Sequence, residues 1–151
     1  MKRSRTRALV LLALFAMAVA ASGVQPAKTD KPFLSVSTRP ERLDLGTAAF
    51  IGPLQVDAAF TVEVDTNCAL GPIYVSATPL KHHNGGSIDP ESIFVRTSAT
   101  DGFIAMKKPV AISPPATGSQ KIVVDVKVIT QALGPAGEYS GVFTFTIAPP
   151  V

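Results

Sequence analysis

The sequence is poor in the residues on which many small exported domains depend. It contains no tryptophan and one cysteine, Cys68, and aromatic residues make up 7% of the chain. A single cysteine excludes an internal disulfide, so a domain built by this chain must be stabilised by its apolar core. Free cysteine is among the residue types most often buried, and we expect Cys68 to be a small core residue. The alternative is an intermolecular disulfide or a reactive thiol.

Catalytic signatures are also missing. The chain has no G-x-S-x-G elbow, no phosphate-binding glycine loop, no dinucleotide fingerprint and no D-x-D-x-D-G calcium loop. A calcium site or a carboxylate pair would have to be assembled in the fold from scattered acidic residues, namely Asp57, Glu63, Asp65, Asp89, Glu91 and Asp101. The sequence therefore predicts a protein that is not an enzyme, with no catalytic, cofactor-binding or metal-binding residues.

The densest group of potential metal ligands is the segment His82-His83-Asn84-Gly85-Gly86. Two imidazoles could bind Zn²⁺ or Cu²⁺. Neighbouring residues of an extended segment point in opposite directions, however, and no third ligand stands at a conventional spacing. We therefore predict a solvated loop here.

The first 20 residues have the features of a cleavable signal peptide. An apolar run of 14 residues, 8–21, follows four basic residues, Lys2, Arg3, Arg5 and Arg7. Ala18 and Ala20 supply the A-x-A spacing required for cleavage after Ala20. An uncleaved transmembrane anchor is the alternative, but crossing a bilayer takes about 20 residues. We predict an exported protein that is periplasmic, surface-located or extracellular, with no membrane anchor after cleavage.

Removal of this segment changes the charge of the chain. The full sequence has 14 basic and 11 acidic residues, and four of the basic ones lie in the signal. The mature chain thus has 10 basic and 11 acidic residues, so its formal charge is close to −1. This balance gives nucleic acid no basic surface to bind, and we predict no nucleic-acid partner.

Period-2 alternation of apolar and polar residues dominates the mature chain. It is clearest in three segments, 60–65, 122–128 and 139–147. Such alternation is typical of strands with one buried and one solvated face. Shorter strands are predicted at Phe33–Ser37, Leu43–Leu45, Ile73–Ala77, Ser92–Arg96 and within 103–112.

Glycine and proline clusters separate these segments. Turns are predicted at Thr38-Arg39-Pro40, Gly52-Pro53, Gly71-Pro72, 84–86, Asp89-Pro90, Asp101-Gly102, 114–118 and 134–137. The best helix candidate, Thr130–Leu133, is at most one turn long. Short strands at this spacing predict an all-β fold, a single immunoglobulin-like Greek-key β-sandwich of about seven or eight strands. Tyr139 begins the last strand and is placed to form a tyrosine corner, with an exposed ligand-stacking tyrosine as the alternative.

Three segments resemble bacterial exported immunoglobulin-like modules of the spore coat protein U and pilin-like type. They are Leu43-Asp44-Leu45-Gly46-Thr47, Phe60–Asn67 (FTVEVDTN) and Ala136–Ile147 (AGEYSGVFTFTI). Such families often carry an early L-D-F-G turn, a V-x-V-x-x-N strand and a closing G-x-Y-x-G strand. The chain lacks the disulfide of many pilins and has enough predicted strands for a complete sandwich. The resemblance therefore implies fold and location more than pilus assembly.

These observations define the expected organisation and two functions. We predict a signal peptide at 1–20, a flexible lead-in at 21–32 and a β-sandwich domain at 33–151. The first function is a structural or interaction module of the bacterial envelope or surface, with a protein partner or self-assembly by strand addition. The second is a secreted module that binds carbohydrate or metal through the loops 81–90, 98–102 and 113–119 at one end of the sandwich.

Overall fold

The computed structural model describes residues 31–44, 52–130 and 137–149. Within these ranges the chain forms thirteen β-strands and one short 3₁₀ helix, η1 (Pro90–Ser92). The strands are β1 (Leu34–Arg39), β2 (Gly52–Thr66), β3 (Ala69–Leu70), β4 (Ile73–Ala77), β5 (Leu80–His82), β6 (Ser87–Ile88), β7 (Ile93–Arg96), β8 (Ile104–Ala105), β9 (Val110–Ser113), β10 (Ala116–Thr117), β11 (Gln120–Thr130), β12 (Tyr139–Ser140) and β13 (Phe143–Ile147). None of these described segments is a helix that could cross a membrane.

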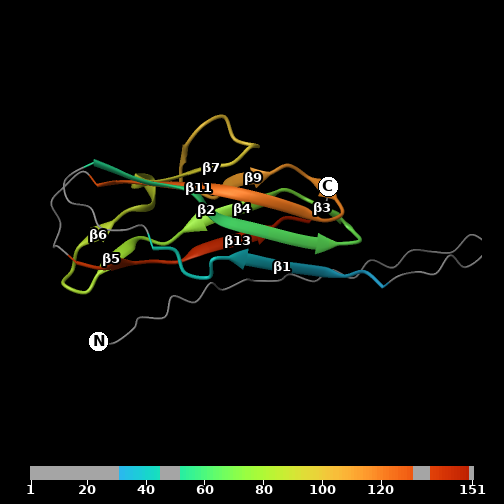
Figure 1. The fold of residues 1–151 in the computed structure, drawn as a ribbon, viewed down its shortest axis with the longest axis horizontal. Coiled ribbons are helices and arrows are strands. Elements are labelled where there is room, and N and C mark those ends of the chain that lie inside the picture. Colours follow the sequence, from blue (N-terminus) through green and yellow to red (C-terminus); the bar gives the residue numbers. More distant parts are fainter. Residues whose placement is uncertain (1–30, 45–51, 131–136, 150–151) are drawn as a thin grey trace, which may run out of the picture.

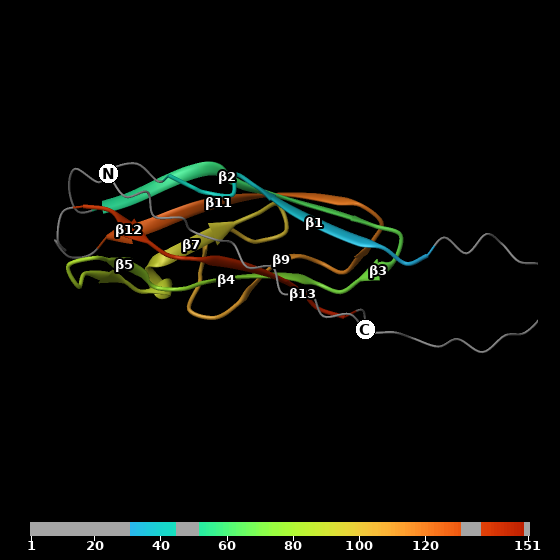
Figure 2. The same ribbon diagram turned by 90° about the horizontal axis from the view of Figure 1, so that it is seen from below.

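The strands lie in two facing layers (Figures 1 and 2). One layer is an antiparallel five-stranded sheet in the order β1-β2-β11-β7-β8. The other is centred on the sheet β13-β4-β9, and the small sheets β12-β5-β6 and β10-β3 lie toward its two ends. This architecture confirms the predicted all-β sandwich. The signal peptide and most of the lead-in lie outside the described residues, and their assignment stays a prediction.

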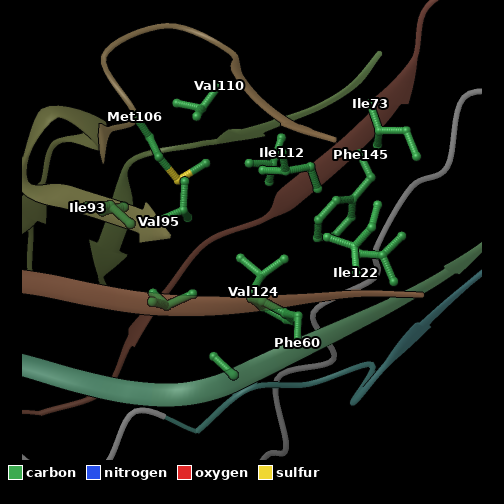
Figure 3. Packing of buried hydrophobic residues seen from close by; sticks show 14 of the residues in the cluster. Phe60, Ile73, Ile93, Val95, Met106, Val110, Ile112, Ile122, Val124 and Phe145 are labelled. Carbon is green, nitrogen blue, oxygen red and sulfur yellow. The ribbon is translucent and has the colours of Figure 1, made fainter. Parts of the chain in front are cut away.

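The core lies between the two layers, where the alternating residues of β11 meet those of the opposite sheet. Val124 and Val126 are fully buried, as are Ile73 and Val75 on β4. Figure 3 shows Ile122, Val124 and Phe60 on one side, and Ile73, Ile112 and Phe145 on the other. Burying such a side chain contributes about 1.5–3 kcal/mol to stability. The period-2 pattern of β11 therefore identified its core face correctly.

The N-terminal half of β2 differs from the sequence prediction. Gly52-Pro53 is not a turn but the start of β2, where Pro53 is paired with Ile129 of β11. Proline lacks the N–H needed in a central strand. It is tolerated because β1 pairs with β2 only along Thr61–Thr66, so in the described structure Pro53 has a neighbouring strand on one side alone.

The second layer contains more strands than predicted. Pro79 separates β4 from β5, and Gly141 and Val142 separate β12 from β13. Proline cannot donate to the ladder at this point. Thr78 and Val142 bridge the gap, because the N–H of Thr78 donates to the carbonyl of Val142 at 2.9 Å. The strand predicted at 139–147 is thereby divided into β12 and β13.

A bulge in β2 is held by a charged contact on the outer face of the five-stranded sheet. Ala58 has a φ of +51°, and the pairing with β11 shifts register between Val124 and Val126. The N–H of Ala58 donates to Oδ1 of Asp125 at 2.8 Å, and Nε of Arg96 donates to Oδ2 of the same carboxylate at 2.8 Å. Burial raises the pKa of Asp125, but these hydrogen bonds and the charge of Arg96 outweigh it and lower the pKa below its ordinary value of 3.8.

Replacing Asp125 with asparagine should weaken this contact in a pH-dependent way. A carboxyl with a lowered pKa stabilises the fold above its unfolded pKa, and this contribution is lost as the pH falls through the folded pKa. We expect Asp125→Asn to lower the free energy of unfolding by about 1–2 kcal/mol near neutral pH and by less below about pH 4. Urea unfolding at both pH values measures the difference. An equal loss at the two values would contradict the assigned role.

Candidate functional site

Two edge strands lie on the same side of the sandwich, one in each layer (Figures 1 and 2). Among the described residues, β1 pairs with β2 alone and β13 pairs with β4 alone. The outer edge of each strand therefore offers backbone N–H and C=O groups without a neighbouring strand in that part of the structure. We call this side of the molecule, formed by residues 34–39 and 143–147, the β1/β13 rim.

The side chains that point inward at the β1/β13 rim are incompletely covered. Val36 of β1 faces Val64 of β2 in register, yet Val64 is 1% exposed and Val36 is only partly buried. Phe143 of β13 is also partly buried, although its ring lies 5.0 Å from that of Phe60. Both edge residues pack against the core cluster and still contact solvent. An additional strand at this rim would cover apolar surface as well as backbone groups.

The β1/β13 rim also lacks the features that usually protect sheet edges. Such edges are commonly interrupted by lysine, proline, bulges or very short strands. The sequence of β13, FTFTI, contains none of these residues, and its pairing with β4 is continuous. The only charged residue of β1, Arg39, stands at its end.

The opposite side of the sandwich, formed by β8 and β9, is protected in several ways. β8 has two residues, and the exposed sequence Lys107-Lys108-Pro109 separates it from β9. A register shift interrupts the pairing of β9 with β4. The two sides therefore differ in the properties that prevent one sheet edge from pairing with another chain.

A second site lies beside β5 and β12. A pocket of about 300 Å³ is lined by Lys81, His82, His83, Glu138 and Ser140. Of these side chains, His82 is the buried one, with 4% of its surface exposed. Tyr139 pairs with His82 across the two strands, and the ring centroids lie 5.1 Å apart. Tyr139 thus begins β12 as predicted, while the hydrogen bond of a tyrosine corner stays a prediction.

The two histidines do not point apart as expected from an extended segment. β5 ends at His82, so His83 belongs to the following turn, and the two rings lie 4.2 Å apart. Nδ1 of His82 accepts a hydrogen bond from the N–H of Asn84 at 3.1 Å. The neutral ring therefore carries its proton on Nε2, where it has no lone pair for a metal. No three His, Cys, Asp or Glu side chains of the described ranges converge as metal ligands.

The other predicted features are placed differently from expectation. Cys68 is partly exposed rather than buried, because it lies in the turn after β2, where its Sγ donates to Oδ1 of Asn67 at 3.3 Å. The segment 81–90 contains the end of β5 and the whole of β6. The segment 113–119 contains β10, which pairs with β3 at the opposite end of the sandwich (Figure 1). The structure therefore does not unite the predicted loops in one binding surface.

The sequence signal for the β1/β13 rim is indirect. Both strands are recognisable from their alternation, but a strand's neighbours are set by contacts between distant parts of the chain. The uncharged sequence FTFTI, without proline, was the one local indication that an edge at this position would be unprotected.

Comparisons with known proteins return a single structural match. No protein-family model matches the sequence, and no curated protein matches it. The chain is similar to one solved structure, the CsuC-CsuE chaperone-tip adhesion subunit pre-assembly complex from archaic chaperone-usher Csu pili of Acinetobacter baumannii. The match has 20% identity and a TM-score of 0.40, and covers 76% of this chain and 39% of the other. A match at this level assigns no family to the chain.

Proposed function

We propose that this chain is an exported, non-enzymatic structural or interaction module of the bacterial envelope or surface, which associates with protein partners by strand addition at the β1/β13 rim. The supporting observation is the contrast between its two sides. The β1/β13 rim has edges of six and five residues with a single charge, at Arg39, and partly exposed apolar side chains, whereas lysines, proline and short strands protect the β8 and β9 side. The signal peptide predicted at 1–20 supports the location.

An added strand would pair with the open backbone groups of this rim and would also cover its partly exposed apolar side chains. A strand beside β13 would satisfy main-chain N–H and C=O groups, which supply affinity in this mode of recognition. Alternate side chains of the added strand would face the core and cover Val36 and Phe143. A partner segment with apolar residues at every second position has the required chemistry.

A matched pair of lysine substitutions on β1 tests this proposal. The side chain of Val36 packs against the core, and that of the next residue, Ser37, is exposed to solvent. We expect Val36→Lys to weaken association about tenfold or more, because an added strand would have to desolvate an unpaired ammonium group. Ser37→Lys adds the same charge to the same strand and should have little effect.

Association is measured by sedimentation of the purified mature chain and by capture of envelope proteins with a tagged copy in native cells. Circular dichroism and thermal unfolding establish that both variants are folded. The pair Ile147→Lys and Thr146→Lys repeats the comparison on β13, where Ile147 is partly buried and Thr146 is exposed. Equal association of the two members of each pair would contradict strand addition at this rim.

A further inference from the structure

His82 connects a turn to the neighbouring strand at one end of the second layer. Its N–H donates to the carbonyl of Gly86 at 2.7 Å, and its carbonyl accepts from the N–H of Gly85 at 3.1 Å. Its side chain accepts from the N–H of Asn84 at 3.1 Å. β5, which ends at His82, pairs with both β6 and β12. One buried residue thus joins the 83–86 turn to the start of the last strand pair.

The contacts of His82 require a neutral imidazole. Nδ1 can accept from Asn84 only while it carries no proton. Nε2 then holds the ring proton, and it has no hydrogen-bond partner in the described structure. A Cβ atom placed on Gly137 would lie 2.3 Å from Nε2, so the backbone of Gly137 closes over this atom. Nε2 is therefore buried beside the backbone of Gly137.

Several charged and polar groups lie around His82. Lys81 precedes it in β5, and the ring of His83, a further potential cation, lies 4.2 Å away. Tyr139 faces it from β12, with the two ring centroids 5.1 Å apart. Glu138 lines the same pocket, but its carboxylate already accepts a bond from the Arg42 guanidinium at 2.9 Å. A proton on Nδ1 would place two N–H donors, that of Nδ1 and that of Asn84, face to face.

We propose that His82 is an acid-sensitive latch, whose protonation releases the 83–86 turn and separates β12 from β5. The latch consists of His82, its three turn contacts and the overlying Gly137. It lies beside the β5–β12 pairing and does not depend on the proposed strand addition. Histidine is the side chain that ordinarily changes charge between about pH 5 and pH 8, a range that an exported protein can encounter.

Residue-resolved amide hydrogen exchange on the mature chain tests the latch. After correction for intrinsic rates, we expect protection at Asn84, Gly85 and Ser140 to fall about tenfold or more between about pH 7.5 and pH 5. Protection in β2 and β11 should stay constant. His82→Asn keeps a side-chain acceptor close to the position of Nδ1 but cannot titrate, so the pH dependence should disappear. His83→Asn is the matched control and should retain it.

Two results would overturn the proposal: unchanged protection in the wild-type chain, or an undiminished fall in His82→Asn. A direct measurement covers the case in which His82→Asn does not fold. Nitrogen-15 NMR of the wild-type imidazoles should find the Nε2–H tautomer at His82 near neutral pH. The pH at which this ring gains its second proton should coincide with the loss of protection, and protonation of His82 without that loss would equally reject the latch.

Discussion

Replacing Phe60 with alanine is expected to lower the free energy of unfolding by about 3–5 kcal/mol, the range for buried phenylalanine. Phe60 belongs to β2 and is 6% exposed. Its ring lies 5.0 Å from that of Phe143 and 6.0 Å from that of Phe145, so one residue of the five-stranded sheet supports two residues of β13. Truncation removes apolar area and leaves a cavity directly under the β1/β13 rim.

The loss should be larger than that for a phenylalanine on the outer face. Phe103 lies under the Arg96 guanidinium at 4.5 Å and the Lys127 ammonium at 4.3 Å, and it is partly exposed. We expect Phe103→Ala to cost about 0.5–1 kcal/mol, the worth of such contacts near the surface. Urea unfolding compares the two variants. Equal losses would show that Phe60 does not support β13 as the structure indicates.

Replacing Gly71 with alanine is expected to cost about 3 kcal/mol and to displace the chain after β13. A Cβ at this position would lie 2.3 Å from the carbonyl oxygen of Pro149 and 2.5 Å from that of Ala148. Both atoms belong to the backbone, which cannot yield by rotating a side chain. Two hydrogen bonds hold the segments together here, from Gly71 N–H to Ala148 at 3.2 Å and from Ala148 N–H to Pro72 at 2.9 Å. The substitution should break both bonds and loosen the end of β13.

Gly141 provides the control for this substitution. A Cβ at Gly141 would approach Cδ2 of Leu80 at 2.6 Å, the end of a flexible side chain that can move. Gly141→Ala should therefore cost less than half as much. Thermal unfolding ranks the two variants, and amide exchange locates the damage. A stable Gly71→Ala variant with an unchanged end of β13 would show that the close approach is not required.

The sequence predicted the strands better than it predicted their neighbours. The prediction for β4 matched Ile73–Ala77, because a short apolar alternation stands between Gly71-Pro72 and Pro79. The turn predicted at Gly52-Pro53 was wrong, because proline and glycine also occur at strand starts and edges, and that position depends on where β1 ends. Pairing between strands far apart in sequence determines which edges stay open, and no local pattern contains this information.

The histidine segment, 82–86, also shows that a local pattern does not predict contacts with distant parts of the chain. Alternation predicts opposite directions for His82 and His83 if both belong to a strand. The strand ends between them, so the second ring turns back toward the first. The burial of His82 depends on β12 and Gly137, more than fifty residues further along the chain. The solvated loop predicted for this segment was wrong for His82, which ends β5 and is buried, although His83 and the following turn are exposed.

The central claim, strand addition at the β1/β13 rim, is tested most directly by amide hydrogen exchange on the mature chain, first alone and then in the assembly isolated from its native cells. We predict that residues 34–39 and 143–147 gain protection on association, while β8 and β9 exchange as in the free chain. A new strand supplies acceptors to the open edges and covers the half-buried apolar residues. Unchanged exchange at the β1/β13 rim, or new protection confined to β8 and β9, would contradict the account.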